Sequence, residues 1–174
     1  MLSTCYNIFG DVMTYKLNKF FLTQKESNPS IQYLSTSYVE LTGSKCEINN
    51  TFLNNKIVYK YSFYLSTKLD GGNSSDLPVF VHLKLQKSND NFSSNIVDIP
   101  GCQVNVSSDD SEDEFYYISV NPLFIIEDFD SKYLRLVGRS YSTLNEAQLH
   151  QVPYYDGSSQ NNVYYDTSLI VMEL

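Results

Sequence analysis

Apolar and polar residues alternate with a period of two along most of this chain, from about residue 37 to the end. Between residues 56 and 67 every second residue is apolar: Ile57, Tyr59, Tyr61, Phe63 and Leu65. After a Gly-Gly-Asn-Ser-Ser turn the pattern returns at four more positions: Val79, Val81, Leu83 and Leu85. Because successive side chains of a β-strand point to opposite faces of a sheet, this spacing predicts strands with one buried face.

The rest of the chain divides in the same way into short strands and polar turns. Further segments rich in Tyr, Ile, Val and Leu are expected to be strands: residues 37–41, 45–48, 115–120, 123–127, 132–142 and 163–174. No segment keeps the helical period over the roughly ten residues that a helix usually needs, although residues 143–149 are long enough for about one or two turns. We therefore predict an all-β fold of two packed antiparallel sheets, a sandwich or a jelly roll.

In the first 30 residues the alternation is only patchy, and this stretch ends in the turn sequence Ser27-Asn28-Pro29-Ser30. We divide the chain here, into an N-terminal arm or first strand or strands (residues 1–30) and a jelly-roll domain (residues 31–174). Exposed apolar side chains on such an arm would need a partner surface. The candidates for docking are Ile8, Phe9, Phe20 and Phe21. The alternative is that the arm packs on its own domain.

The charge balance and the lengths of the apolar runs exclude several classes of protein. Acidic residues outnumber basic ones by 20 to 12, for a formal net charge of −8. The basic residues are also scattered, whereas nucleic-acid binding requires them to be clustered. The longest apolar runs, such as Leu123–Ile126, are much shorter than the roughly 20 residues of a membrane helix. Asp11, Lys16 and Lys19 interrupt what would be the apolar core of a signal peptide. We expect no nucleic-acid partner, no membrane span and no secretion signal.

Residues with chemical reactivity are few and widely spaced. The odd number and the spacing of the cysteines argue against a disulfide framework and a zinc motif, so we expect free thiols in a reducing compartment. The histidines are His82, on an expected strand, and His150, in a loop, and no Gly-x-Ser-x-Gly nucleophile motif occurs. The acidic run Asp109–Glu114 lacks the glycine of a calcium loop and is typical of a solvated turn. The sequence predicts no enzymatic activity, no metal and no cofactor.

Tyrosine is unusually frequent, with 15 residues, and tryptophan is absent. Tyrosines occur as adjacent pairs at Tyr116-Tyr117, Tyr154-Tyr155 and Tyr164-Tyr165. Adjacent strand residues point to opposite faces, so one tyrosine of each pair can fill the core while the other faces solvent or a partner. Exposed tyrosines are enriched in protein interfaces. The alternative is compositional bias, since an A+T-rich coding sequence also favours Asn, Ile, Tyr and Lys.

Three stretches in order resemble the opening strands of jelly-roll domains related to tumour necrosis factor and the complement globular head: Tyr38–Ser44, Asn55–Leu65 and Val81–Leu85. Tyr133–Val137 resembles the penultimate strand of those domains, and Val163–Leu174 resembles the final strand, which ends inside the sheet near the trimer axis. The cytokine members show Tyr-Phe-Gly before the last apolar run, where this chain has Tyr165-Asp166-Thr167.

The chain is most similar to the variant in structural proteins of large double-stranded DNA viruses and virophages, with V-E-x-x-G-S, V-Y-x-Y-x-F and V-H-x-K-L in this order. This resemblance implies a homotrimeric, non-enzymatic capsid-associated protein: a minor capsid, cement, cap or spike protein. Such a protein is made in the host cytoplasm, is located in the virion and contacts other capsid proteins. The candidates for the trimer interface are Tyr59, Tyr61, Tyr164, Tyr165, Leu169 and Val171.

Two other functions are consistent with the sequence. A lectin-like head that binds a host receptor or glycan would use loop residues that can stack on a pyranose and bond its hydroxyls: Tyr154, Tyr155, Asp156 and Asn161. A glycosidase on a sandwich scaffold would need two carboxylates about 5–9 Å apart across a cleft.

Overall fold

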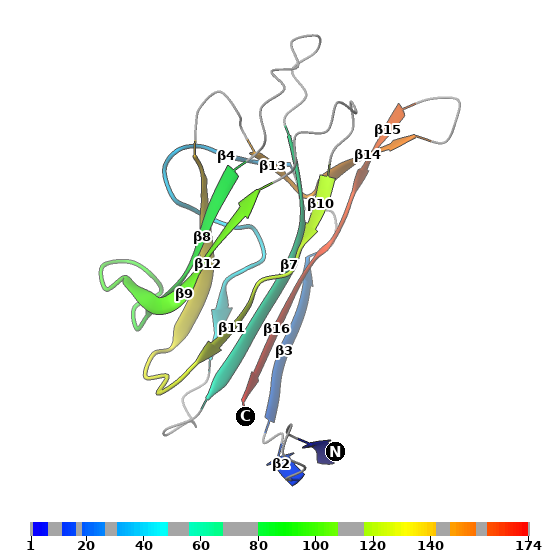
Figure 1. The fold of residues 1–174 in the computed structure, drawn as a ribbon. Coiled ribbons are helices and arrows are strands. Elements are labelled where there is room, and N and C mark those ends of the chain that lie inside the picture. The colour runs from blue at the N-terminus through cyan, green and yellow to red at the C-terminus, as the bar shows by residue number, and fades with distance from the viewer. Residues whose placement is uncertain are drawn as a thin grey trace.

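The described part of the chain is all-β, with two antiparallel sheets that form a β-sandwich and two separate hairpins (Figure 1). The computed structural model describes the backbone of residues 2–6, 12–16, 19–26, 31–48, 56–67, 80–107, 117–141, 147–155 and 160–173, and the side chains of residues 31–48, 56–66, 80–107, 118–141, 147–150 and 165–173. The all-β prediction is confirmed. Within these residues, no helix has the length and apolar character that a membrane crossing requires.

The larger sheet has seven described strands. Its main path runs β3 (Lys19–Glu26), β16 (Thr167–Glu173), β7 (Ile57–Thr67), β13 (Ala147–Leu149) and β4 (Gln32–Leu34). β10 (Tyr117–Val120) and β11 (Leu123–Ile126) also pair with β7. β11 and β16 both pair with the first half of β7 and therefore lie along its two opposite edges. β7 is the strand around which this sheet is organised.

The smaller sheet has five described strands. Its order is β5 (Val39–Glu40), β12 (Tyr133–Ser140), β8 (Phe80–Ser88) and β9 (Val97–Ser107), and β6 (Cys46–Glu47) also pairs with β12. The separate hairpins are β1 (Leu2–Tyr6) with β2 (Val12–Lys16), and β14 (Gln151–Tyr155) with β15 (Gln160–Tyr164). The two sheets pack against each other as the layers of the sandwich. Within the larger sheet, β3 runs alongside β16 (Figure 1).

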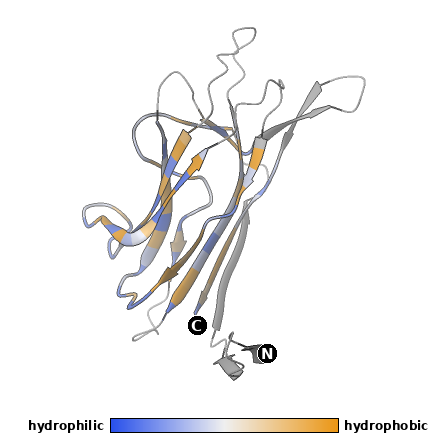
Figure 2. Cartoon of the chain, viewed as in Figure 1, coloured by the Kyte–Doolittle hydropathy of each residue, from blue (hydrophilic) through white to orange (hydrophobic). Residues whose placement is uncertain are grey.

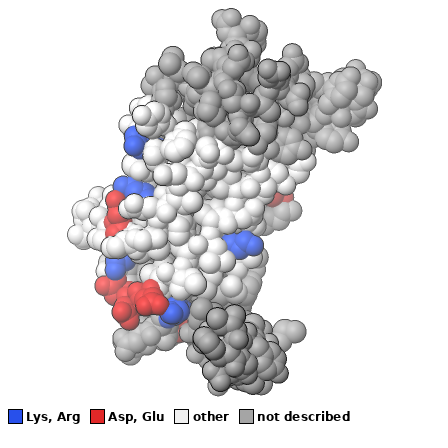
Figure 3. All heavy atoms as spheres, in the orientation of Figure 1, with Lys and Arg blue, Asp and Glu red and all other residues white. Residues whose placement is uncertain are grey.

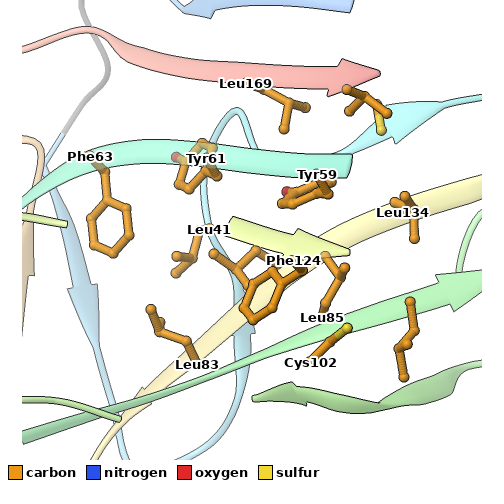
Figure 4. Close-up of a cluster of buried hydrophobic side chains, with 14 of the residues drawn as sticks. Leu41, Tyr59, Tyr61, Phe63, Leu83, Leu85, Cys102, Phe124, Leu134 and Leu169 are labelled. Atoms are coloured by element: carbon orange, nitrogen blue, oxygen red, sulfur yellow. The ribbon is translucent and has the colours of Figure 1, made fainter. Parts of the chain in front are cut away.

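The core lies between the two sheets and contains the residues that the alternation selects. The five alternating residues of β7 from Ile57 to Leu65 are each 2% exposed or less. They face the other sheet, where Leu83, Leu85 and Leu134 are equally buried (Figure 4). Hydrophobic residues alternate with hydrophilic ones along β8, for example (Figure 2). Cys46 and Cys102 are buried free thiols in this core, as expected from the sequence.

Two buried tyrosines of β7 connect the sheets through hydrogen bonds that we call the tyrosine clamp, formed by Tyr59, Tyr61, Thr42 and Ser44. The Tyr59 hydroxyl donates to the Ser44 carbonyl at 2.5 Å, and the Tyr61 hydroxyl donates to the Thr42 carbonyl. The Ser44 hydroxyl in turn donates to the carbonyl of Leu136 in the smaller sheet at 3.0 Å. Because a buried hydroxyl without a partner is costly, these bonds allow tyrosines to occupy the core.

The segment 41–44 reaches this position through a turn at Gly43. The φ angle of Gly43 is 79°, in the left-handed region that favours glycine. The Leu41 N–H donates to the Leu136 carbonyl at 3.0 Å, and the Ser44 N–H donates to the Leu41 carbonyl at 3.0 Å. The turn thus presents the Thr42 and Ser44 carbonyls to the tyrosines of the opposite sheet.

Two boundaries differ from those expected from the sequence, and residues 19–26 form a strand, one of the alternatives that the sequence left open for residues 1–30. Residues 147–149 form β13 and not part of a helical turn. The final strand is divided, because β15 ends at Tyr164 and β16 begins at Thr167. Within residues 1–30, the segment 19–26 is β3, which pairs with β16 in the larger sheet.

Tyr59→Phe is expected to lower the free energy of unfolding by about 1–2 kcal/mol, because it leaves the buried Ser44 carbonyl without its donor. Urea unfolding followed by circular dichroism measures this change. Tyr141→Phe is the matched control, since Tyr141 is 68% exposed and the loss of an exposed hydroxyl should change stability by less than about 0.5 kcal/mol. Equal stability of Tyr59→Phe and the parent protein would contradict the role of the clamp.

Candidate assembly surface

The outer face of the larger sheet is formed by the residues that alternate with its core. On β11, Phe124 and Ile126 are buried, whereas Leu123 and Ile125 are 54% and 52% exposed. On β16, Leu169 and Val171 are buried, whereas Ile170 and Met172 are half-buried. We call the outward set the outer apolar face: Val58, Lys60, Tyr64, Leu123, Ile125, Tyr165, Ile170 and Met172.

The strand register places these residues in rows across three strands. Ile125 of β11 is opposite Val58 of β7, which is opposite Met172 of β16. In the next row Lys60 lies between Leu123 and Ile170. Side chains directly opposite each other on one face of a sheet are in contact range. The result is a row of apolar side chains in which Val58 is buried (6% exposed) between Ile125 and Met172, with Lys60 in the next row.

Two tyrosines extend this surface toward the β13 end of the sheet. The rings of Tyr64 and Tyr165 lie with their centroids 4.5 Å apart, and both residues are half-buried. Their backbones are linked through His150, whose N–H donates to the Tyr64 carbonyl at 2.9 Å and whose carbonyl accepts the Tyr165 N–H at 3.0 Å. On the side of the molecule in Figure 3, much of the described surface is uncharged, and acidic and basic side chains gather along the edge over the smaller sheet and its loops.

Four of the six residues proposed for a trimer interface lie in the core. Tyr59, Tyr61 and Leu169 are fully buried and Val171 is 1% exposed. Their side chains face the other sheet of the same chain, so they are not available for contacts with another subunit. Tyr165 is on the outer apolar face, and the Tyr164 side chain lies outside the described residues.

The other predicted sites lie only partly within the described residues. Ile8, Phe9 and Asp156 lie outside them, and Phe20 and Phe21 lie on β3. Tyr154 and Tyr155 are on β14, and Asn161 on β15 is the register partner of Tyr154. The structure therefore brings Tyr154 and Asn161 together across a hairpin.

Leu123 and Ile125 were not among the predicted interface residues, although the sequence contained a signal for them. Residues 123–126 read Leu-Phe-Ile-Ile, which is apolar at every position. A strand without alternation is typical of a sheet buried on both faces. On β11, the face with Phe124 and Ile126 is buried in the core, and the face with Leu123 and Ile125 is exposed.

The described residues contain no group of three or more His, Cys, Asp and Glu side chains that could hold a metal ion. The two histidines lie in different parts of the fold, His82 on β8 and His150 between β13 and β14. His82 is on the outer face of β8, with Nδ1 2.7 Å from Asn105 Oδ1. His150 is buried beside Phe63, and its ring nitrogens have no hydrogen-bond partner in the described structure. This burial lowers the pKa of His150 to about 4, because it disfavours the charged imidazolium.

The chain was compared with protein-family models and with curated proteins, and no match was found.

The stability of the protein is expected to depend on pH because His150 is buried. Its pKa falls from 6.5 to about 4 on folding, so below pH 6.5 the unfolded state binds a proton that the folded state does not. The folding equilibrium constant should therefore decrease by about tenfold per pH unit as the pH falls from about 6.5 toward 4. Urea unfolding at pH 7, 6 and 5 measures this slope.

His150→Gln should flatten the slope between pH 6.5 and 5, above the usual pKa range of carboxyl groups. His82→Gln is the matched control and should retain the slope, since it removes the histidine that is not in the core. An unchanged slope in His150→Gln would assign the pH dependence to other groups.

Proposed function

We propose that this protein is a non-enzymatic structural subunit, a homotrimeric jelly roll of the tumour necrosis factor type that serves as a capsid-associated protein of a virion. The observation that carries the assembly role is the outer apolar face, where Leu123 and Ile125 are each more than half exposed. Burying apolar surface contributes about 25 cal/mol per Å². A face of this kind is stabilised when another subunit covers it.

The order of the strands supports the jelly-roll part of the proposal. In chain order the pairs are nested: β3 with β16, β5 and β6 with β12, β7 with β10 and β11, and β8 with β9. The pair of β4 with β13 is nested between the first two of these pairs and lies in the larger sheet, and the three pairs inside it alternate between the sheets. Nested antiparallel pairs are expected when one long hairpin is wound into a sandwich, so this order supports a double-sheet jelly roll.

The sequence motifs behind the resemblance also have a structural role. Ser44 ends V-E-x-x-G-S, and its carbonyl accepts the hydroxyl of Tyr59 from V-Y-x-Y-x-F. Glu40 of the first motif is paired with Arg135 of β12 at 3.3 Å. Two of the three motifs thus meet in the tyrosine clamp, which favours a shared fold as their explanation. The virion location and the contacts with other capsid proteins are inferred from this resemblance.

A trimer is the closed assembly that the resemblance implies, and closed symmetry is the usual outcome for soluble oligomers. β16 contributes Ile170 and Met172 to the outer apolar face. In the related domains this final strand runs near the trimer axis. We therefore assign the subunit contact to the outer surface of β7, β11 and β16.

Ile125→Asp is expected to convert the trimer to monomers, because a buried carboxylate without a partner is strongly unfavourable. Sedimentation equilibrium should give three times the 20.0 kDa subunit mass for the parent protein and the subunit mass for the variant. Val97→Asp is the control, since Val97 is 49% exposed on β9 of the other sheet. It should leave the trimer intact.

A parent protein that is monomeric at micromolar concentration would refute the assembly role. The virion location is tested separately by mass spectrometry of purified particles from the source of the gene. Absence of its peptides from the particles would refute the capsid role alone.

The alternative function is a receptor-binding or glycan-binding head, favoured by the cross-strand pair of Tyr154 and Asn161 on the β14–β15 hairpin. Tyrosine and asparagine are residue types suited to stack on a sugar and to bond its hydroxyls. A glycan array should then show binding that Tyr154→Ala abolishes, with Tyr33→Ala, an exposed tyrosine outside the hairpin, as the control. Binding that persists in Tyr154→Ala would exclude the hairpin pair.

A further inference from the structure

The outer face of the smaller sheet carries a row of polar side chains between exposed rings. Arg139 of β12, His82 of β8 and Asn105 of β9 lie side by side, because they are register partners across the three strands. Three exposed rings surround this row: Tyr38 (41% exposed), Phe80 (37%) and Tyr141 (68%). We call Tyr38, Phe80, His82, Arg139 and Tyr141 the aromatic–arginine patch.

The rings lie on two sides of the polar row. On one side, the Arg139 guanidinium carbon is 5.3 Å from the centre of the Tyr38 ring. On the other side, the Phe80 ring lies 5.2 Å from the His82 ring and 5.9 Å from the Tyr141 ring, edge to face in both cases. A standard protein interface uses about 20–30 residues a side. The patch is much smaller and is comparable in size with one sugar ring.

Arg139 differs from the other cations of this sheet in having no carboxylate partner among the described residues. Lys84 is paired with Asp98 at 2.7 Å, and Arg135 with Glu40 at 3.3 Å. The hydrogen bond from Lys84 holds the pKa of the Asp98 carboxyl below its usual range. The Arg139 Nη1 reaches only the Thr36 carbonyl, at 3.5 Å. The patch therefore contains an unneutralised guanidinium in a chain whose net charge is −8.

Two buried nitrogen atoms in the patch also lack partners. Arg139 Nε and His82 Nε2 are buried and have no hydrogen-bond partner in the described structure. Buried polar atoms in folded proteins are usually hydrogen-bonded, because leaving one unpaired is costly. The ring of Tyr141, which is 68% exposed, lies 6.1 Å from the His82 ring, centroid to centroid.

We propose that the aromatic–arginine patch binds an acidic sugar at the end of a glycan, a pyranose that carries a carboxylate. The planar guanidinium of Arg139 is matched to a carboxylate, and the Phe80 and Tyr141 rings pack against the apolar face of the sugar. Asn105 supplies an amide for the sugar hydroxyls. This site goes beyond the assembly role and lies on the smaller sheet, so the proposed trimer contact on the larger sheet leaves it open.

The test measures binding of 3′-sialyllactose, with lactose as the matched neutral probe, by isothermal titration calorimetry and saturation-transfer NMR on the full chain. Sialyllactose should bind and lactose should not, and affinity should fall as salt is added. Arg139→Ala and Tyr141→Ala should each weaken binding by at least about tenfold, as expected for loss of a charge-assisted contact or a stacking ring.

The matched controls are Arg135→Ala, on the same strand and face, and Tyr33→Ala, an exposed tyrosine of β4. Both should bind sialyllactose as the parent protein does, and circular dichroism verifies that each variant is folded. No binding of sialyllactose, equal binding of lactose, or unchanged binding by Arg139→Ala and Tyr141→Ala would each overturn the proposal. Displacement of sialyllactose by an acidic hexapeptide would also overturn it, by assigning the patch to protein docking. None of these binding results depends on whether the protein is a trimer, so failure of this proposal can be distinguished from failure of the proposed assembly role.

Discussion

The structure depends on two phenol groups that are buried without being left unpaired. Tyr59 and Tyr61 are fully buried between the sheets, where an unpartnered hydroxyl would offset part of the stability that burial of its ring contributes. The carbonyls of Thr42 and Ser44 accept those hydroxyls, and Ser44 also bonds to Leu136 across a separation of 92 residues. The larger sheet is therefore held to the smaller sheet at a defined position.

Once the inner faces are packed, the two outer faces have different chemistry. The larger sheet presents aliphatic side chains such as Leu123 and Ile125, which favour coverage by another subunit. The smaller sheet presents ion pairs such as Lys84 with Asp98 and the exposed rings around Arg139, which favour a small charged ligand. A sandwich separates these faces, so the proposed assembly surface and the proposed ligand site do not compete for the same residues.

Strands were predictable from the sequence where alternation was uninterrupted, as in β7, β8 and β12. β9 was missed because Pro100 and Gly101 resemble strand breakers, yet both lie inside this strand. Gly101 has a φ of 75°, and the pairing of β9 with β8 shifts register between Lys84 and Gln86, so the strand tolerates both residues through an irregularity. Tyr59 and Leu169 were predicted to lie in a subunit interface, but their side chains are on the core side of β7 and β16. The prediction was wrong because the most apolar positions of a strand are the first to be buried in its own core.

The sequence by itself determined that this chain forms strands with two distinct faces, because a period of two allows no other regular structure to separate apolar from polar residues. It also determined which residues share a face. Only the tertiary structure decided which face is inside and which strands are neighbours. Those choices depend on contacts between residues far apart in the chain, such as Ser44 with Leu136 and β3 with β16, and such contacts are selected by packing and hydrogen-bond satisfaction in the whole core.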